Sequence, residues 1–324
     1  MIARVAEHCF WLQRYMERTE NTARLLQVNL TFLLDTAMPA GRRWRPVLQA
    51  TGEEEGFLAR FGAVNADDGE AVQNYMCWDL RNPVSLVTSL HNTRENARTI
   101  REPVSLEMWS SVNAFWIWLD GGAGQRLYDR DRHAFYEQVK EYCQLFQGQF
   151  HTTMLFDRPY DFMQLGSLLE RSDQTARLLA AMVDRAEAEE TGRSAITVAG
   201  WLAILRSCSA VESYAKRTQA PLSAESVVGF LLQEPAFPRA VRHCLEEATR
   251  VLAGLWSVDD GRPLRSIQLL EELLYGLSER TPFELLHDGV AAEVSRLLTG
   301  TALATDQIRQ EFFASPPVLA GDIT

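Results

Sequence analysis

The chain has few lysines, few cysteines and no long uninterrupted apolar segment: only two of its 32 basic residues are lysine, and five residues are cysteine. Without about 18 consecutive apolar residues it predicts no membrane-spanning helix, and Glu7 interrupts the apolar stretch that a signal peptide would need. The cysteines are far apart, odd in number and never in a Cys-x-x-Cys pair, which argues against disulfides and a zinc site. We therefore expect a cytoplasmic protein without a membrane partner, metal or cofactor.

The chain also lacks an excess of positive charge and the short motifs of common enzyme classes. Its 43 acidic residues exceed its basic residues, for a net charge of -11, which disfavours nucleic acid as a partner. It contains no G-x-S-x-G, P-loop, H-E-x-x-H or G-x-G-x-x-G motif. A lone Glu284-Leu-Leu-His287 has no second copy, as a di-iron helical bundle would require. Without these motifs, the sequence gives no support for the common classes of hydrolase and nucleotide-binding enzyme that they identify.

What the sequence does contain is helical periodicity, over 324 residues of which 46% are hydrophobic. From Val5 to Leu33, apolar or small residues recur at alternating steps of four and three, which is typical of a helix packed in a bundle. Similar patterns predict helices over 84–100, 105–119, 134–156, 160–186, 198–216, 238–256, 265–278 and 283–299. Predicted breaks lie near 39–41 and at 52–69, 120–124, 189–194 and 259–263. Because period-two strand patterns are nearly absent, we predict an all-α helical bundle.

An internal repeat divides the chain. The segment LQRYMERTENTARLL at 12–26 matches LGSLLERSDQTARLL at 165–179, at an offset of 153 residues. Weaker similarities follow in the same order, including NPVSLVTSL from Asn82 against FPRAVRHCL from Phe237. We therefore predict two pseudo-symmetric repeats of about 155 residues that pack as one unit about a pseudo-two-fold axis. The N-terminal repeat would span 1–157 and the C-terminal repeat 158–314, with 315–324 as a flexible tail.

The repeated segment places a polar ridge beside the apolar stripe of each helix. The ridge and its neighbours comprise Glu17, Arg18, Asn21 and Arg24 in the first copy and Glu170, Arg171, Gln174 and Arg177 in the second. Small residues beside the ridges would let the two helices approach closely, so that Glu17 reaches Arg171 or Arg177. In the same geometry Glu170 would reach Arg18 or Arg24. Two interpretations follow: a buried ion-pair network that fixes the register of the halves, or a network that partly lines a ligand cavity.

A second charged pattern lies in HNTRENARTIRE, where Arg94, Arg98 and Arg101 fall at i, i+4 and i+7 on one helix face. Neighbouring like charges repel, and Glu95 relieves only part of this repulsion. The motif glutamates of the repeat could neutralise the arginines, or an anionic ligand such as a carboxylate or phosphate could do so. A solvated charged face is the third interpretation.

These segments together resemble the bacterial alpha-E family, which is named for an α-helical domain with a recurrent Glu-Arg motif. The resemblance rests on RVAEHCFWLQRYMERTENTARLL, on NPVSLVTSLHNTRENARTIREPVSLEMWSSVN, on FMQLGSLLERSDQTARLL and on EPAFPRAVRHCL. It implies a protein that works beside ATP-grasp-type ligases, often with transglutaminase-like peptidases, in systems that form peptides or amides. The family motif positions carry over to Glu17, Arg18, Arg94, Glu95, Asn96, Arg98, Glu170 and Arg171. Gln13 departs from the family pattern, which more usually has glycine there.

Two functional hypotheses remain. In the first, the chain is a component of an ATP-grasp-associated peptide- or amide-forming system, and a central Arg/Glu cavity binds an amino acid, peptide or acyl-phosphate. Arg94, Arg98 and Arg101 would hold the anionic group, while Glu17 or Glu170 would bind the ammonium or act as general base. General-base catalysis would require a raised glutamate pKa. In the second hypothesis the chain is a non-catalytic scaffold that docks the ligase, and its Glu-Arg network is purely structural.

Overall fold

The computed structural model describes residues 3–35, 43–187, 195–218, 221–256, 264–287 and 289–314. Helices make up most of these residues and none of them forms a strand, which confirms the predicted all-α class. The helices of the first half are α1 (Ala3–Asp35), α2 (Arg45–Thr51), α3 (Glu54–Phe61), η1 (Ala63–Asp67), α4 (Gly69–Trp78), α5 (Leu86–Thr99), α6 (Leu106–Asp120), α7 (Ala123–Arg130) and α8 (Arg132–Thr153). Those of the second half are α9 (Arg158–Glu187), α10 (Ala195–Ser207), α11 (Val211–Arg217), α12 (Ala224–Gln233), α13 (Val241–Leu255), α14 (Arg265–Ser278), α15 (Pro282–His287), α16 (Val290–Ile308) and η3 (Arg309–Phe313).

The structure corrects the predicted boundaries where short helices occur. The predicted break at 52–69 contains α3 and η1, and Gly52 and Gly62, both with positive φ, stand before them. The predicted helix over 198–216 is interrupted after α10, where Ser209 has φ 50°. The predicted helix over 283–299 divides into α15 and α16 at Gly289, which has φ 100°. Helices of two or three turns carry too few apolar repeats for periodicity to define them.

Four of the expected features fall on residues outside the described part of the chain. They are the predicted break near 39–41, the breaks at 189–194 and 259–263, and the tail at 315–324. The predicted break at 120–124 is confirmed, since α6 ends at Asp120 and α7 begins at Ala123. Gly122 lies between them with φ 80°, a conformation that favours glycine.

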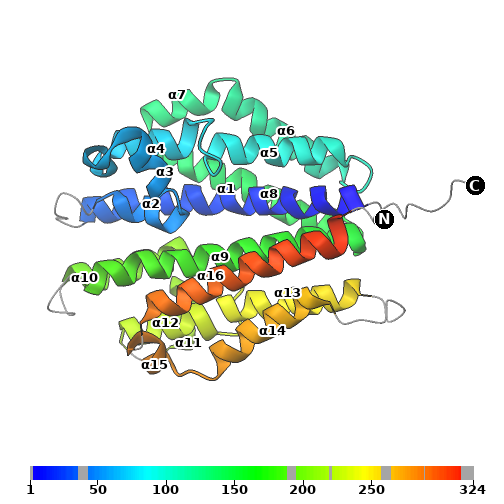
Figure 1. Ribbon diagram of the computed structural model, residues 1–324. Coiled ribbons are helices and arrows are strands. Elements are labelled where there is room, and N and C mark those ends of the chain that lie inside the picture. Colours follow the sequence, from blue (N-terminus) through cyan, green and yellow to red (C-terminus); the bar gives the residue numbers. More distant parts are fainter. Residues whose placement is uncertain are drawn as a thin grey trace, which may run out of the picture.

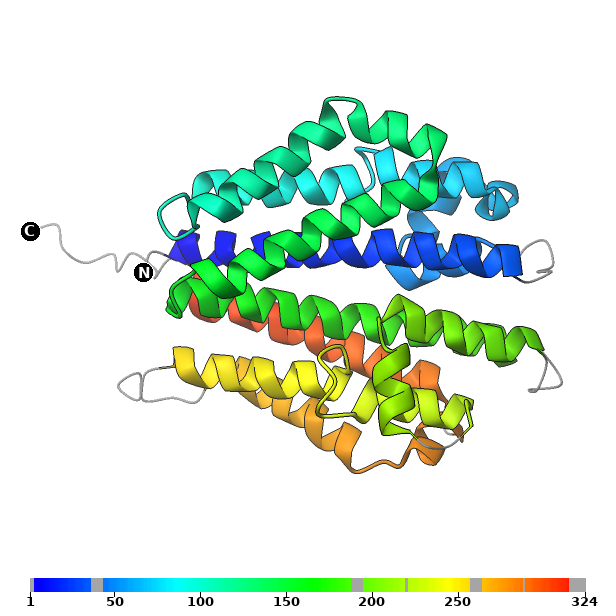
Figure 2. The same ribbon diagram turned by 180° about the vertical axis from the view of Figure 1, so that it is seen from behind.

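The two long helices α1 and α9 lie side by side and parallel at the centre of the molecule (Figure 1). Helices α5 and α8 pack on α1, and helices α13 and α16 pack on α9. Helix α6 contacts α5 and α8, while α14 contacts α13 and α16. Seen from behind, the helices before α9 lie on one side of this central pair and most of those after it on the other (Figure 2). The α1–α9 interface therefore joins the two halves of the chain.

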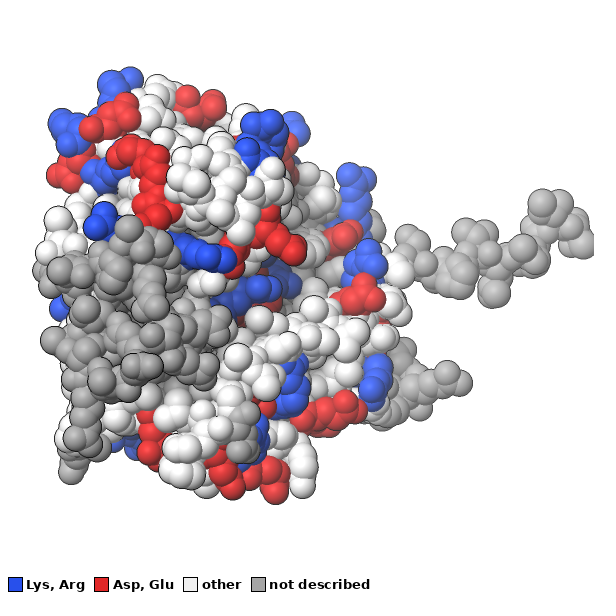
Figure 3. All heavy atoms as spheres, turned by 60° about the vertical axis from the view of Figure 1, so that its left-hand side comes forward, with Lys and Arg blue, Asp and Glu red and all other residues white. Residues whose placement is uncertain are grey.

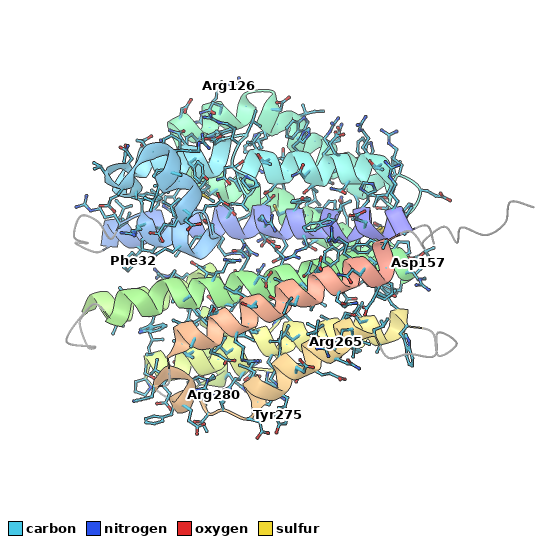
Figure 4. The ribbon with its side chains drawn as sticks, in the orientation of Figure 1. Phe32, Arg126, Asp157, Arg265, Tyr275 and Arg280 are labelled. Atoms are coloured by element: carbon cyan, nitrogen blue, oxygen red, sulfur yellow. The ribbon has the colours of Figure 1, made fainter. Side chains whose placement is uncertain are left out.

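The second helix of each half also packs across this interface. Helix α2 follows α1 in sequence yet packs on α9, and α10 follows α9 yet packs on α1. Trp44 before α2 and Trp201 in α10 are both buried, as are Leu48 and Leu205 one turn further on. Figure 4 gives the orientation: Phe32 lies toward the end of α1, and Asp157 lies at the opposite end of the bundle, where α9 begins.

The described helices and cysteines bear on the expected setting of the protein. Among the residues that the structure describes, no helix is long and apolar enough to cross a membrane. All five cysteines are buried free thiols. Burial raises the pKa of Cys77 to about 12 and of Cys208 to about 11, so these thiols are poor nucleophiles at neutral pH.

Candidate functional site

Glu17 lies in the middle of α1, fully buried against α9. Its carboxylate forms an ion pair with Arg171 Nε at 2.9 Å and accepts a hydrogen bond of 2.8 Å from Arg239 Nη1. Ser167 on α9 donates a further hydrogen bond of 3.1 Å. Arg239 stands just before α13, so the carboxylate ties three segments of the chain together.

Glu170 lies at the corresponding position of α9 and is 2% exposed. Arg18 approaches it in a bidentate manner, with Nε at 2.6 Å from one carboxylate oxygen and Nη2 at 2.9 Å from the other. Arg14 donates from Nε at 2.9 Å. Two guanidinium groups of α1 therefore hold one carboxylate of α9 by charge-assisted hydrogen bonds.

The two Glu-Arg motifs thus exchange partners across the interface. The arginine of each motif binds the glutamate of the other, which confirms the predicted contacts of Glu17 with Arg171 and of Glu170 with Arg18. Both contacts join residues 152 to 154 apart in sequence, close to the offset of the sequence repeat. The matched segments of the two helices therefore face one another in register.

The other predicted members of the ridge make different contacts. Asn21 accepts a hydrogen bond of 2.7 Å from Arg239 and donates one of 3.3 Å to Glu17. Arg24 pairs with Glu20 on its own helix instead of Glu170. Arg177 lies against the end of α2, where a Cβ on Gly52 would come within 2.9 Å of its guanidinium.

Burial and paired charge act in opposite directions on the two motif glutamates. Burial alone would raise the pKa of Glu17, but Arg171 and Arg239 lower that pKa to about 2. Burial would likewise raise the pKa of Glu170, and Arg18 and Arg14 lower it to about 2. A general base that works near neutral pH needs the opposite shift. The geometry therefore disfavours the catalytic role predicted for either glutamate.

The lowered pKa values predict a loss of stability in acid. A carboxyl group whose folded pKa is depressed contributes stability above its unfolded pKa and loses it as the pH falls through the folded pKa. For Glu17 and Glu170 this window runs from the ordinary 4.5 down to about 2. Each carboxylate is expected to contribute about 3 kcal/mol above the window. Urea denaturation at a series of pH values should show this loss, and a Glu17→Gln variant should lose less over the same range; an equal loss would contradict the assignment.

Sequence reasoning missed several members of the network. Arg14 lies one turn before Glu17 on the same face of α1, and this spacing could have identified it as a member of the network. Its counterpart in α9 at the repeat offset is Ser167, which also contacts a motif glutamate but brings no charge. Arg239 supplies that charge from elsewhere, and the matched position in the first half is Val84, so the repeat gave no signal for it. The two glutamates thus differ in their second arginine.

The structure does not bring the arginine stripe of α5 to the motif glutamates. Arg94 and Arg98 both pair with Glu95, at 3.2 and 2.6 Å. Arg101 lies in the turn after α5, which ends at Thr99, so the prediction that it shares one helix face with Arg94 and Arg98 is wrong. Its guanidinium lies over the ring of Trp109, 4.5 Å from the centroid. The Arg98 side chain is 60% exposed and that of Arg94 is 26% exposed, so both reach the surface. Of the three interpretations of the stripe, the one in which Glu17 and Glu170 neutralise it is wrong, because those carboxylates pair with other arginines.

The remaining motif residue of α5 links this helix to the start of α1. Asn96 Oδ1 lies 2.7 Å from His8 Nδ1, and Asn96 also donates to the carbonyl of Asn92. The small residues Ser89, Thr93 and Ala97 belong to the buried face of α5, which also includes Leu86, Val87 and Leu90. Because α5 packs on α1 through this face, its arginines point away from the Glu-Arg network.

The surface is mixed in charge on the face that Figure 3 shows, where basic and acidic side chains are interspersed and form no large area of one sign. Within the described ranges, no group of three or more His, Cys, Asp or Glu side chains is placed to hold a metal ion. The chemically distinctive feature of the described structure is therefore the buried Glu-Arg network between α1 and α9.

A family model described as a predicted alpha-helical domain with a conserved ER motif matches residues 1–313. The chain belongs to the Alpha-E family. In this Alpha-E protein the Glu-Arg dipeptides at 17–18 and 170–171 are the residues that exchange partners across the interface.

Curated relatives of this Alpha-E chain are uncharacterized proteins of Mycobacterium bovis and of two strains of Mycobacterium tuberculosis. Each is 25% identical over 98% of this chain. The chain spans only 37% of the length of these relatives, so the Alpha-E region is one part of a longer protein there. No solved structure was found to match the chain.

Proposed function

We propose that this chain is a non-catalytic helical subunit that docks an ATP-grasp-type ligase of a peptide- or amide-forming system. The observation that carries the proposal is the state of the motif glutamates: both are buried, both are paired with arginines, and both have a pKa of about 2. A glutamate in this state holds two helices together and is a poor proton acceptor at neutral pH. The Glu-Arg motif is therefore structural, and we call the exchanged pairs Glu17–Arg171 and Glu170–Arg18 the clasp.

The proposed partner and setting come from the family resemblance and not from the geometry. The resemblance implies ATP-grasp-type ligases, with transglutaminase-like peptidases as further partners, and free cysteines suit a cytoplasmic setting. The Alpha-E region occurs within much longer chains in the mycobacterial relatives, which supports a module that works beside others. A rigid bundle suits such a docking role, because helices present fixed surfaces to a partner.

We also infer that the bundle consists of two related repeats, 1–157 and 158–314, about an internal two-fold axis. The exchanged Glu-Arg pairs support this inference, because each motif uses the same residue types toward the other. The crossed packing of α2 on α9 and of α10 on α1 supports it as well. So does the parallel between α5 and α8 on α1 and α13 and α16 on α9.

The test uses an Arg98→Ala variant with the ATP-grasp ligase, ATP, magnesium and pooled amino acids, followed by mass spectrometry of the products. Because Arg98 is exposed and pairs only with Glu95 among the described residues, its removal should cost less than about 1 kcal/mol of unfolding free energy. Product formation should continue wherever the variant still binds the ligase in a pull-down. Circular dichroism controls for folding. A folded variant that binds the ligase normally but forms no product would overturn the scaffold proposal and favour ligand binding at the arginine stripe.

A further inference from the structure

The Glu-Arg network reaches the surface at a pocket of about 360 Å³ between α1, α9, α16 and η3. Arg14 and Asp173 form its charged floor, and Phe10, Trp11 and Phe313 supply its aromatic wall. Thr305, Asp306 and Arg309 also line it, and the latter two are exposed. This size lies within the range of pockets that bind small molecules.

The floor has hydrogen-bonding capacity that the described residues do not use. Arg14 donates through Nε to Glu170, through Nη2 to Asp173 and through Nη1 to Thr305. Each terminal nitrogen thus keeps one N–H group without a partner in the described ranges. Asp173 accepts one hydrogen bond on each oxygen, at 2.9 Å from Arg14 and 2.6 Å from Thr301, where a carboxylate can accept about four.

The charge on Asp173 is less well compensated than that on its neighbour Glu170. Burial raises the pKa of Asp173, and Arg14 offsets this only in part, whereas the pKa of Glu170 falls to about 2. The side chain of Asp173 is 17% exposed, so it remains accessible from the pocket. A cation beside this carboxylate would be stabilised by its charge. The ring faces of Phe10 and Trp11 already hold the Arg14 guanidinium, 5.6 and 5.4 Å from their centroids, so these rings contribute apolar surface to the pocket.

The rim has the features of a built site. The chain closes the pocket with a π-helical turn, in which Ala314 N donates to Arg309 O at 2.9 Å. π-Helical turns are rare in proteins, and those that do occur are often found at functional sites. The turn places Phe313 against Phe10, with ring centroids 5.6 Å apart. Among the residues that the structure describes, Arg309 forms an ion pair with Asp306 at 2.9 Å.

We propose that this pocket binds a free amino acid or the N-terminal residue of a short peptide. Asp173 accepts hydrogen bonds from the ligand ammonium group, the aromatic wall contacts an apolar ligand side chain, and Arg309 holds the carboxylate or the peptide carbonyl. A carboxylate and a guanidinium group that line the same aromatic pocket match the two charges of a zwitterion. This site is distinct from the proposed docking role, and its test requires no ligase.

The experiment is calorimetric titration of the purified full-length chain with L-leucine, its amide, its N-acetyl derivative and the dipeptide leucyl-leucine. We expect saturable binding of leucine or the dipeptide below about 10 mM, and binding about tenfold weaker or worse for the N-acetyl derivative, which has no ammonium group. Tighter binding of the dipeptide than of leucine would identify a peptide ligand. Tighter binding of leucine than of its amide and the dipeptide would identify a free amino acid.

A pair of substitutions on α16 locates the site. Ala302 lines the pocket and is exposed, so Ala302→Trp should fill the space and weaken binding about tenfold or more while the fold is retained. Leu303 is 55% exposed and is not among the residues that line the pocket, so Leu303→Trp is the matched control and should bind as the parent does. Asp173→Asn should also weaken binding, and Ala302→Trp keeps the test decisive if that variant fails to fold. No saturable binding of any compound, equal binding of the N-acetyl form, or unchanged binding by Ala302→Trp would overturn the proposal.

Discussion

Replacement of Glu17 by glutamine is expected to lower the free energy of unfolding by about 3 to 5 kcal/mol. Glutamine has nearly the shape of glutamate, so packing is preserved and the change isolates the charge. The substitution leaves Arg171 and Arg239 beside a neutral amide, in a position where the native side chain is 0% exposed. Uncompensated cations in such a place cannot recover their lost hydration.

Denaturation by guanidinium chloride, followed by circular dichroism, measures this loss of unfolding free energy. The matched control is Glu95→Gln. Glu95 also pairs with two arginines, Arg94 and Arg98, but at the surface of α5. Solvent screens such pairs, so the control should lose less than about 1 kcal/mol. Similar losses in the two variants would show that the clasp contributes no more than a surface ion pair.

The buried clasp has a structural consequence beyond its contribution to stability. Apolar side chains alone would allow two long parallel helices to slide by one turn with a modest loss of packing. Glu170 binds Arg14 and Arg18 of α1, and Glu17 binds Arg171 of α9, so a shift of one turn would separate both carboxylates from these partners. Buried ion pairs add little net stability but penalise such alternatives strongly. We therefore interpret the Glu-Arg motif as the element that specifies the register of α1 against α9.

The sequence predicted this interface because its signals are local and repeated. Helical periodicity defines which residues share a face, and the repeat at 12–26 and 165–179 indicated that two such faces are related. Charge complementarity then left two candidate partners for each glutamate, Arg171 or Arg177 for Glu17 and Arg18 or Arg24 for Glu170, and the structure has the first of each pair. The contribution of Arg239 was not predictable, because it lies 222 residues from Glu17 and has no charged counterpart in the first half.

The arginine stripe shows the limit of spacing as evidence. Positions 94 and 98 share one face of α5, as predicted, whereas Arg101 lies beyond Thr99, where that helix ends. Spacing does not say which face of a helix is buried. The small residues Ser89, Thr93 and Ala97 let α5 approach α1, and the arginines therefore stay outside. Packing between distant segments decides this orientation, and that information is not contained in a single helix.

Replacement of Gly166 by alanine is the second change with a large expected effect. Gly166 lies where α9 closely approaches the backbone of α1: an added Cβ would lie 2.2 Å from the carbonyl oxygen of Phe10 and 3.0 Å from its carbonyl carbon. Because the obstructing atoms belong to the backbone, no rotamer change relieves the contact and the helices must separate. Alanine gains about 1 kcal/mol in helix propensity, but overpacking against backbone outweighs this gain. We expect a net loss of about 3 kcal/mol in unfolding free energy.

Gly148 in α8 provides the matched control, since an added Cβ there meets no atom within 4 Å. Gly148→Ala should raise the free energy of unfolding by about 0.5 to 1 kcal/mol, so the two substitutions should have opposite signs. Gln13, the counterpart of Gly166 in α1, instead faces α8, where its amide bonds to Gln147 at 3.2 Å. Only one of the two matched positions therefore requires glycine for the close approach. A Gly166→Ala variant as stable as the parent would contradict this prediction, because it would show that α1 and α9 leave room for a Cβ at this position.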